Sequence, residues 1–197
     1  FHYASSLPNI ERLHVSTNGL CAPELIKSFE KCSSDNTAFS IQTSIDGDED
    51  LHNKIRGNKN AYNKLIELLE LTCEFKSKYK ILLDRLLVMT VSKQNRKFVS
   101  HTMELAREYD VPLTLNFVRA STTSNLDKCE MSDFSPVDDD KNGLTVSEME
   151  SVVDEWKIGA KKLFDIYSYQ KELLRFETII HYQKKSEWFF PCAAGIN

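Results

Sequence analysis

The fold is decided by the stretch Ile81-Leu82-Leu83-Asp84-Arg85-Leu86-Leu87-Val88-Met89-Thr90-Val91. Its leucines and valines predict a β-strand buried on both faces, which is typical of a parallel sheet covered by helices. Further apolar runs on either side of it along the chain predict strands at Leu13–Thr17, Phe39–Ser44 and Val111–Val118.

Predicted helices separate these strands. Pro23 predicts the start of the first helix, because its fixed backbone angle suits the first turn of a helix. Apolar residues at helical spacing predict two more helices, at about Lys59–Thr72 and Phe98–Glu108. Strand and helix in alternation, with short links, indicate an α/β fold with a parallel sheet made of right-handed β-α-β units. In such sheets ligands bind where the strands end, at their carboxyl edge.

The composition narrows the range of functions. The 197 residues include 25 Lys and Arg against 29 Asp and Glu, so the net charge of −4 gives no support to nucleic-acid binding. We expect no membrane partner either, because no apolar run approaches the ~18 residues of a membrane helix. Five scattered cysteines without a C-x-x-C pair lack the spacing of a disulfide framework, which favours a reducing cytoplasm.

The most informative polar segment follows the second predicted strand. Ser44 and Asp46 can bond a ribose or an amino acid, Gly47 allows a tight turn, and Arg56 offers a planar fork for a carboxylate. On residue chemistry alone a second interpretation is favoured. In it, Asp46 caps a turn of a polar loop, and Arg56 pairs on the surface with a nearby acid, Asp48 or Glu49.

The region after Ala120 is polar and carries the run Asp138-Asp139-Asp140. It begins like a calcium-binding loop, but Met149 stands at the twelfth position, where a bidentate carboxylate is required. We therefore expect a solvated connection or an insertion over residues 121–142. Next, Thr145 and Glu148 have the spacing of a capping box. One long helical stretch is predicted from there towards residue 181.

Both ends of the chain indicate a fragment of a longer protein. Phe1 is not an initiator Met, and the final residues are apolar and aromatic. Cys192 follows Pro191 in this last segment and precedes two alanines and a glycine. Small neighbours allow a bulky cluster to approach the backbone, although for a single cysteine a buried thiol is the favoured interpretation.

Taken in order, these segments resemble radical S-adenosylmethionine (radical SAM) enzymes of the branch with a C-terminal SPASM or twitch-like cluster domain, such as the anaerobic sulfatase-maturing and peptide-modifying enzymes. The resemblance covers nearly the whole chain, and no single motif in it is specific. The residues that carry it are Thr17-Asn18-Gly19, Ser44-Ile45-Asp46-Gly47 with His52 and Ile55-Arg56-Gly57, Thr90-Val91-Ser92-Lys93-Gln94-Asn95, Phe117-Val118-Arg119 and Pro191-Cys192-Ala193-Ala194-Gly195.

The resemblance implies a partial (β/α)6 TIM-like barrel in residues 1–182, with its third to sixth strands present and its first two missing. Residues 183–197 would begin the auxiliary-cluster domain. The three-cysteine motif of the radical-generating [4Fe–4S] cluster has no counterpart in this chain. We therefore expect the chain alone to be inactive.

The resemblance also implies roles for individual residues. Ser44 would bond the ribose or methionine part of S-adenosylmethionine, and Asp46 would shape the loop. Arg56 would pair with the methionine carboxylate, Val118 would lie against adenine, and Asn18 would line the same cavity. The one metal ligand is Cys192, which would bind an auxiliary iron–sulfur cluster.

In the whole protein the implied activity is reductive cleavage of S-adenosylmethionine to modify a substrate, most often a peptide or a protein. The implied partners are that substrate and a reductase for the cluster, in the cytoplasm. Two alternatives stay open. One is a non-catalytic binding module on a degenerate barrel, and the other is an unrelated α/β enzyme that uses the acidic loop for a divalent metal.

Overall fold

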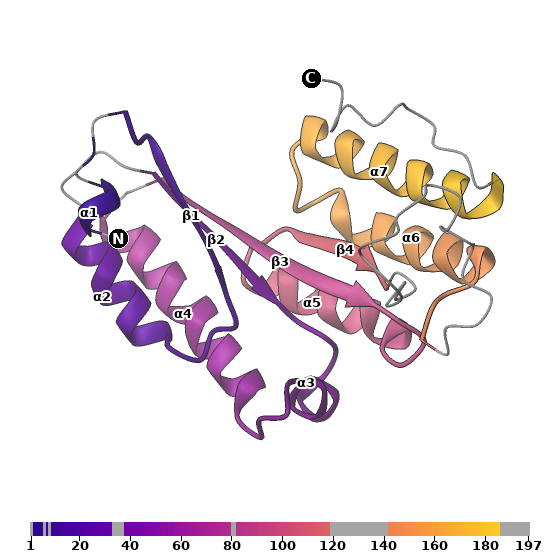
Figure 1. Ribbon diagram of the computed structural model, residues 1–197, viewed down its shortest axis with the longest axis horizontal. Helices are drawn as coiled ribbons and strands as arrows, with labels where there is room; N and C mark the ends of the chain where they lie inside the picture. Colours follow the sequence, from indigo (N-terminus) through magenta and orange to yellow (C-terminus); the bar gives the residue numbers. More distant parts are fainter. Residues whose placement is uncertain are drawn as a thin grey trace, which may run out of the picture.

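The computed structural model describes residues 2–5, 7, 9–32, 38–79, 82–118 and 142–185. Four strands and a series of helices alternate along most of this range (Figure 1). The strands are β1 (Arg12–Thr17), β2 (Ala38–Ser44), β3 (Leu83–Val91) and β4 (Leu113–Phe117). The helices are α1 (His2–Ser5), α2 (Ala22–Cys32), α3 (Glu49–Arg56), α4 (Ala61–Tyr79), the short 3-10 turn η1 (Arg96–Phe98), α5 (Val99–Glu108), α6 (Val146–Ala160) and α7 (Ile166–Lys185).

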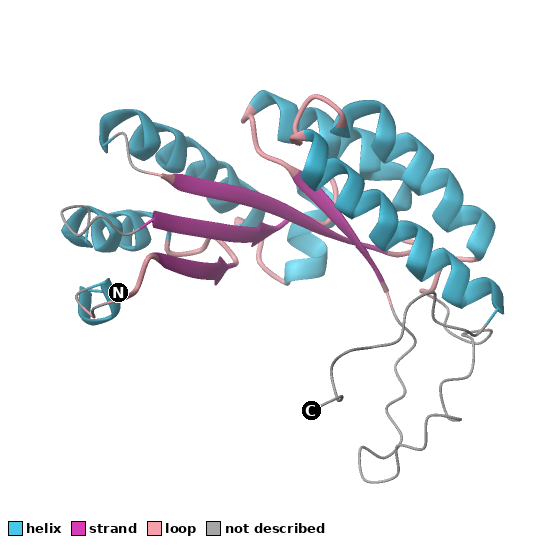
Figure 2. Cartoon of the chain, turned by 90° about the horizontal axis from the view of Figure 1, so that it is seen from above, coloured by secondary structure: helices cyan, strands magenta, loops and turns pink. Residues whose placement is uncertain are grey.

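The sheet has the order β1-β2-β3-β4, and every neighbouring pair is parallel. The predicted α/β class and the four predicted strands are therefore confirmed. Consecutive parallel strands need a crossover between each pair, and α2, the pair α3 and α4, and α5 supply the three crossovers. The four strands fan out in a strongly twisted sheet in Figure 2.

One face of the sheet holds the core. Strand residues on this face pack against α2 and α4 at one end and against α4, α5, α6 and α7 at the other. Figure 1 shows α2 and α4 side by side along β1 and β2. The strand residues of these two clusters are Leu13, Val15, Phe39, Ile41, Leu83, Leu87, Met89, Val91, Leu113, Leu115 and Phe117.

The second face of the sheet is polar. The two core clusters draw no strand residue from it. On β3 it carries exposed Asp84 and Thr90, half-buried Leu86 and buried Val88. The expectation that β3 is buried on both faces is therefore wrong, since Asp84 and Thr90 are exposed on the second face, whereas the first face is covered by helices and is apolar except for half-buried Arg85. The sequence suggested burial on both faces because Leu86 and Val88 are apolar residues on the polar face.

Helix α7 covers the outer edge of the sheet. The Arg175 guanidinium donates to the Leu115 carbonyl at 2.6 Å, to Thr114 Oγ1 at 2.8 Å and to Asn116 Oδ1 at 3.2 Å. Glu172 binds the same Thr114 hydroxyl. The bond to the Leu115 carbonyl occupies a backbone acceptor of β4 that another strand could otherwise bind.

The predicted single helix from Thr145 towards residue 181 is in fact two helices. The capping box of Thr145 and Glu148 starts α6 as expected. The Asp165 carboxylate then accepts the backbone N–H groups of Tyr167 and Ser168, both at 3.0 Å, and so starts α7 as a separate helix. Trp156 of α6 joins the two helices by stacking on Tyr169 of α7, with ring centroids 5.7 Å apart.

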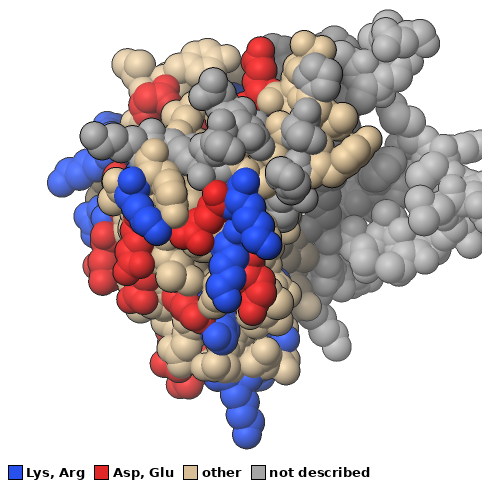
Figure 3. Space-filling model, turned by 90° about the vertical axis from the view of Figure 1, so that its left-hand side faces the viewer, with Lys and Arg blue, Asp and Glu red and all other residues tan. Residues whose placement is uncertain are grey.

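Among the described residues, none of the helices combines the length and the apolar character that crossing a membrane requires. The view in Figure 3 shows Lys and Arg side chains interspersed with Asp and Glu over one side of the molecule. That side carries no extended surface of a single charge, in agreement with the nearly balanced composition.

Candidate functional site

Because all four strands are parallel, their carboxyl ends lie at one edge of the sheet. Asn18 follows β1 there, Ser44 ends β2, and Val118 follows β4. The turn after β1 needs its glycine: Gly19 has φ +79°, and an added Cβ would lie 3.3 Å from the Lys64 carbonyl oxygen. The Asn18 side chain holds this turn by accepting the Leu20 backbone N–H at 3.2 Å.

The segment after β2 is a helix rather than the expected loop. Asp48 accepts the Leu51 backbone N–H at 3.0 Å and caps the amino end of α3. Gly57 closes its carboxyl end in the left-handed conformation, with φ 63°. Sequence reasoning missed this helix because it contains few apolar residues, although the cap, acidic first turn and final glycine were all visible in the sequence.

Helix α3 carries Arg56 back to the end of β2. Arg56 Nε donates to Asp46 Oδ2 at 2.6 Å. The Asp46 side chain is only 8% exposed, whereas that of Arg56 is 33% exposed. Asp46 and Arg56 therefore bind each other, which corrects the interpretation in which Arg56 pairs with Asp48 or Glu49 and Asp46 caps a turn.

The buried ring of His52 completes this cluster. Its Nδ1 atom lies 3.2 Å from the Asp46 backbone nitrogen and 3.3 Å from Asp46 Oδ2. A neutral ring with its proton on Nε2 accepts the backbone N–H, whereas a charged ring donates to the carboxylate. Asp46 therefore offers His52 a hydrogen-bond partner in either protonation state. Tyr62 packs edge-on against the same ring, with centroids 6.0 Å apart.

The environment of Asp46 favours its charged form. Burial alone raises the pKa of the Asp46 carboxyl, but the hydrogen bond with His52 and the positive charge of Arg56 act in the opposite direction. Together they outweigh burial, so the pKa of Asp46 lies below its ordinary value of 3.8. At neutral pH this carboxylate is a fixed negative charge that orients Arg56.

Arg56 has further hydrogen-bonding capacity. A guanidinium has five N–H donors, and in the described part of the chain the recorded bond of Arg56 uses Nε alone. The two terminal amino groups are those that bind a carboxylate as a fork. A guanidinium anchored through Nε and partly exposed fits an external carboxylate.

The other predicted site residues share the edge but do not touch. In the register of the sheet, Ser44 pairs with Val88 of β3, and Val88 pairs with Thr114 of β4. Val118 therefore lies two strands across and four residues further along than Ser44. With about 4.8 Å between strands and about 3.3 Å per residue, the two positions are roughly 16 Å apart. Only an elongated ligand lying along the edge could contact both.

Cys192, the predicted metal ligand, lies outside the described residues, as does the acidic run 138–140. Within the described ranges, no three or more His, Cys, Asp or Glu side chains are grouped so that they could hold a metal ion.

Sequence reasoning did not single out the polar groups on the second face of the sheet. There, His14 Nδ1 lies 3.1 Å from Ser40 Oγ on the neighbouring strand. Arg12 of β1 forms an ion pair with Asp84 of β3, across β2. The alternation of apolar and polar residues in β1 and β2 was the signal available for this face.

No known protein-family model matches this chain, and no curated protein matches its sequence significantly.

Proposed function

We propose that this chain is part of a radical SAM enzyme and that the carboxyl edge of its sheet binds S-adenosylmethionine. One observation carries the proposal: a partly exposed Arg56, anchored through Nε to a buried carboxylate, stands beside the end of a parallel strand. That position is where α/β sheets bind ligands, and its chemistry suits the carboxylate of an amino acid.

The architecture supports the same proposal. Four parallel strands in consecutive order have an apolar face packed on helices and a second face that is polar. Parallel sheets normally cover both faces. A sheet that continues into a (β/α)6 barrel would turn its polar face inward, where a ligand and a substrate could bind. In this proposal the chain supplies strands three to six.

The chain's own residues would then bind and orient the ligand. Arg56 would hold the methionine carboxylate through its terminal amino groups, while Asp46 keeps the guanidinium in place. The Ser44 hydroxyl would donate a hydrogen bond to the ligand, or accept one from it, at the same edge. Val118 would make an apolar contact with the adenine ring two strands away. Asn18 is level with Ser44 by register and would line the site.

The reduced iron–sulfur cluster of such an enzyme supplies the electron that cleaves S-adenosylmethionine. In the proposal, three cysteines outside this chain bind that cluster, and Cys192 binds an auxiliary one. The substrate is a peptide or a protein, and a reductase is the further partner in the cytoplasm.

A non-catalytic module that binds a nucleoside-like ligand is the second candidate, since anchoring of Arg56 serves binding as well as catalysis. The two differ in turnover: only the enzyme forms deoxyadenosine when it is reduced.

The proposal is tested by calorimetric titration of S-adenosylmethionine into the enzyme with its clusters and into its Arg56→Ala variant. Loss of a charged hydrogen bond of about 1.5–3 kcal/mol weakens binding by roughly 10- to 150-fold. Arg107→Ala is the matched control, because Arg107 is exposed on α5. Equal affinity of wild type and Arg56→Ala would remove the basis of the proposal.

A further inference from the structure

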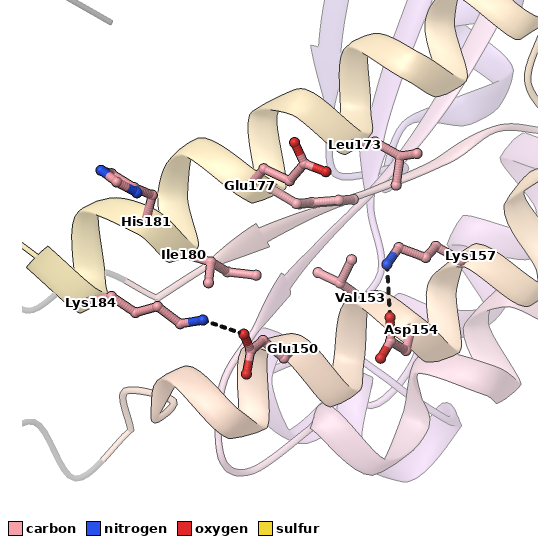
Figure 4. Close-up of a pocket in the computed structure, with 10 residues that line it drawn as sticks. Glu150, Val153, Asp154, Lys157, Leu173, Glu177, Ile180, His181 and Lys184 are labelled. Carbon is pink, nitrogen blue, oxygen red and sulfur yellow. Dashed lines mark hydrogen bonds and ion pairs between the residues drawn. The ribbon is translucent and has the colours of Figure 1, made fainter. Parts of the chain in front are cut away.

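Helices α6 and α7 leave a groove between them. It has a volume of about 530 Å³, and none of the residues of the carboxyl-edge site lines it. Figure 4 shows that its sides come from these two helices alone. Its lining residues are Glu150, Val153, Asp154, Lys157, Leu173, Phe176, Glu177, Ile180, His181 and Lys184.

The middle of the groove is apolar. Val153 and Phe176 are buried in its floor, and Leu173 and Ile180 of α7 are half-buried along it. Apolar side chains that are half-exposed in a groove between two helices favour an apolar occupant, because its binding removes their surface from water.

Four of the charged side chains that line the groove form two ion pairs, and Glu177 is a further carboxylate in the lining. Lys184 of α7 pairs with Glu150 of α6 at 2.6 Å and bridges one end of the groove, as the dashed line in Figure 4 shows. Lys157 pairs with Asp154 at 2.8 Å. Because both lysines already have carboxylate partners, these pairs offer little attraction to a charged ligand. An uncharged, apolar occupant fits better than an ion.

We propose that residues 186–197 of this chain fold back into the groove and that their aromatic side chains fill it. The segment follows directly on α7, which ends at Lys185, one residue after the lysine that bridges the end of the groove. It contains Trp188, Phe189 and Phe190 in succession, followed by Pro191. These are the apolar residues that the groove requires.

The lengths agree with this. From Leu173 to Lys184 the helix rises about 16 Å at 1.5 Å per residue. An extended chain covers about 3.3 Å per residue, so roughly five residues run the length of the groove. Residues 186 and 187 would turn the chain back at the end of α7. The next three residues, about 10 Å long when extended, would then place the three aromatic side chains along the part of the groove beside Ile180.

The test uses fluorine NMR of the full chain labelled with 5-fluorotryptophan. The sequence has two tryptophans, Trp156 and Trp188. Trp188→Phe assigns the signals by removing one of them. A docked Trp188 gives a signal away from the free-amino-acid position, with a solvent isotope shift less than half that of an exposed indole.

Substitution of the groove gives the decisive comparison. Ile180→Glu places a carboxylate among the apolar lining within reach of the segment, and the Trp188 signal is expected to move to the exposed position with the full isotope shift. Leu174→Glu is the matched control, because Leu174 is 48% exposed and does not line the groove. Its Trp188 signal is expected to stay in place. The signal of buried Trp156 shows in each variant that the fold is retained.

Three results would overturn the proposal. One is a Trp188 signal with the full isotope shift in the wild-type chain. Another is an equal response to Ile180→Glu and Leu174→Glu. The third is protection of Trp188 that disappears on dilution, since the groove would then be filled by the segment of a second copy. None of them bears on the proposed S-adenosylmethionine site.

Discussion

Removing the bond between Asp46 and Arg56 is expected to lower the free energy of unfolding by an amount that depends on pH. Asp46→Asn keeps the size of the side chain and removes its charge. The wild-type carboxylate is 8% exposed and accepts Arg56 Nε at 2.6 Å. A hydrogen bond between charged groups contributes about 1.5–3 kcal/mol, and the one-third exposure of Arg56 reduces the effect of charge. We expect a loss of about 2 kcal/mol in the free energy of unfolding at pH 7.

The sign of the pH dependence follows from the lowered pKa of Asp46. Folding favours the charged carboxylate, so its contribution is fully present above the ordinary value of 3.8 and is lost as the pH falls through the lower pKa of the folded state. The difference between wild type and Asp46→Asn is therefore constant from pH 7 to about 5 and shrinks at lower pH.

The assay is urea unfolding followed by circular dichroism at pH 7, 5, 4 and below. Asp154→Asn is the matched control, because that side chain is 72% exposed and forms a surface pair with Lys157. We expect it to change the free energy of unfolding by a few tenths of a kcal/mol at most. A loss below about 0.5 kcal/mol for Asp46→Asn at pH 7 would refute the reasoning, as would a loss that does not shrink in acid.

Three further substitutions have expected results that can be measured. Gly159→Ala would place a Cβ 2.2 Å from Met103 Cγ, and the overpacking cost of about 1–3 kcal/mol exceeds the helix-propensity gain of about 1 kcal/mol. The melting temperature is expected to fall, and an increase would show that α5 and α6 separate easily. Trp156→Phe leaves the buried Leu113 carbonyl, now bonded at 2.6 Å, without its side-chain donor, so urea unfolding should show a loss of about 1–3 kcal/mol; a neutral result would contradict that role. Cys192→Ala, in the enzyme purified with its clusters, should lower the iron content without abolishing the radical-generating cluster; equal iron per chain would exclude Cys192 as a ligand.

Local patterns were sufficient for most elements. The capping box of Thr145 and Glu148 and the apolar strands appear where the sequence predicts them. Such signals depend on residues a few positions apart, which the sequence displays directly. The missed break before α7 was also local, since Asp165 is a good amino-terminal cap. It was hidden by the apolar residues that continue on both sides of it.

The carboxylate that pairs with Arg56 could not be predicted from local patterns in the same way. Asp46, Asp48 and Glu49 are all carboxylates near Arg56 in sequence, and the sequence alone favoured the last two. The fold decides for Asp46, because Asp48 caps α3 and the end of that helix brings Arg56 back to β2. Buried His52 then fixes the chosen carboxylate from a third side.

By itself, the sequence determined the α/β class, the parallel strands and the turns at their ends, because strand and helix periodicity and turn residues act over short distances. Only the tertiary structure decided that one face of the sheet is polar, that α7 covers the edge of β4, and that Asp46 holds Arg56. Arg175 and Leu115 show the reason: they bond although 60 residues separate them in the chain. Such a contact depends on how whole helices pack, which no local pattern encodes.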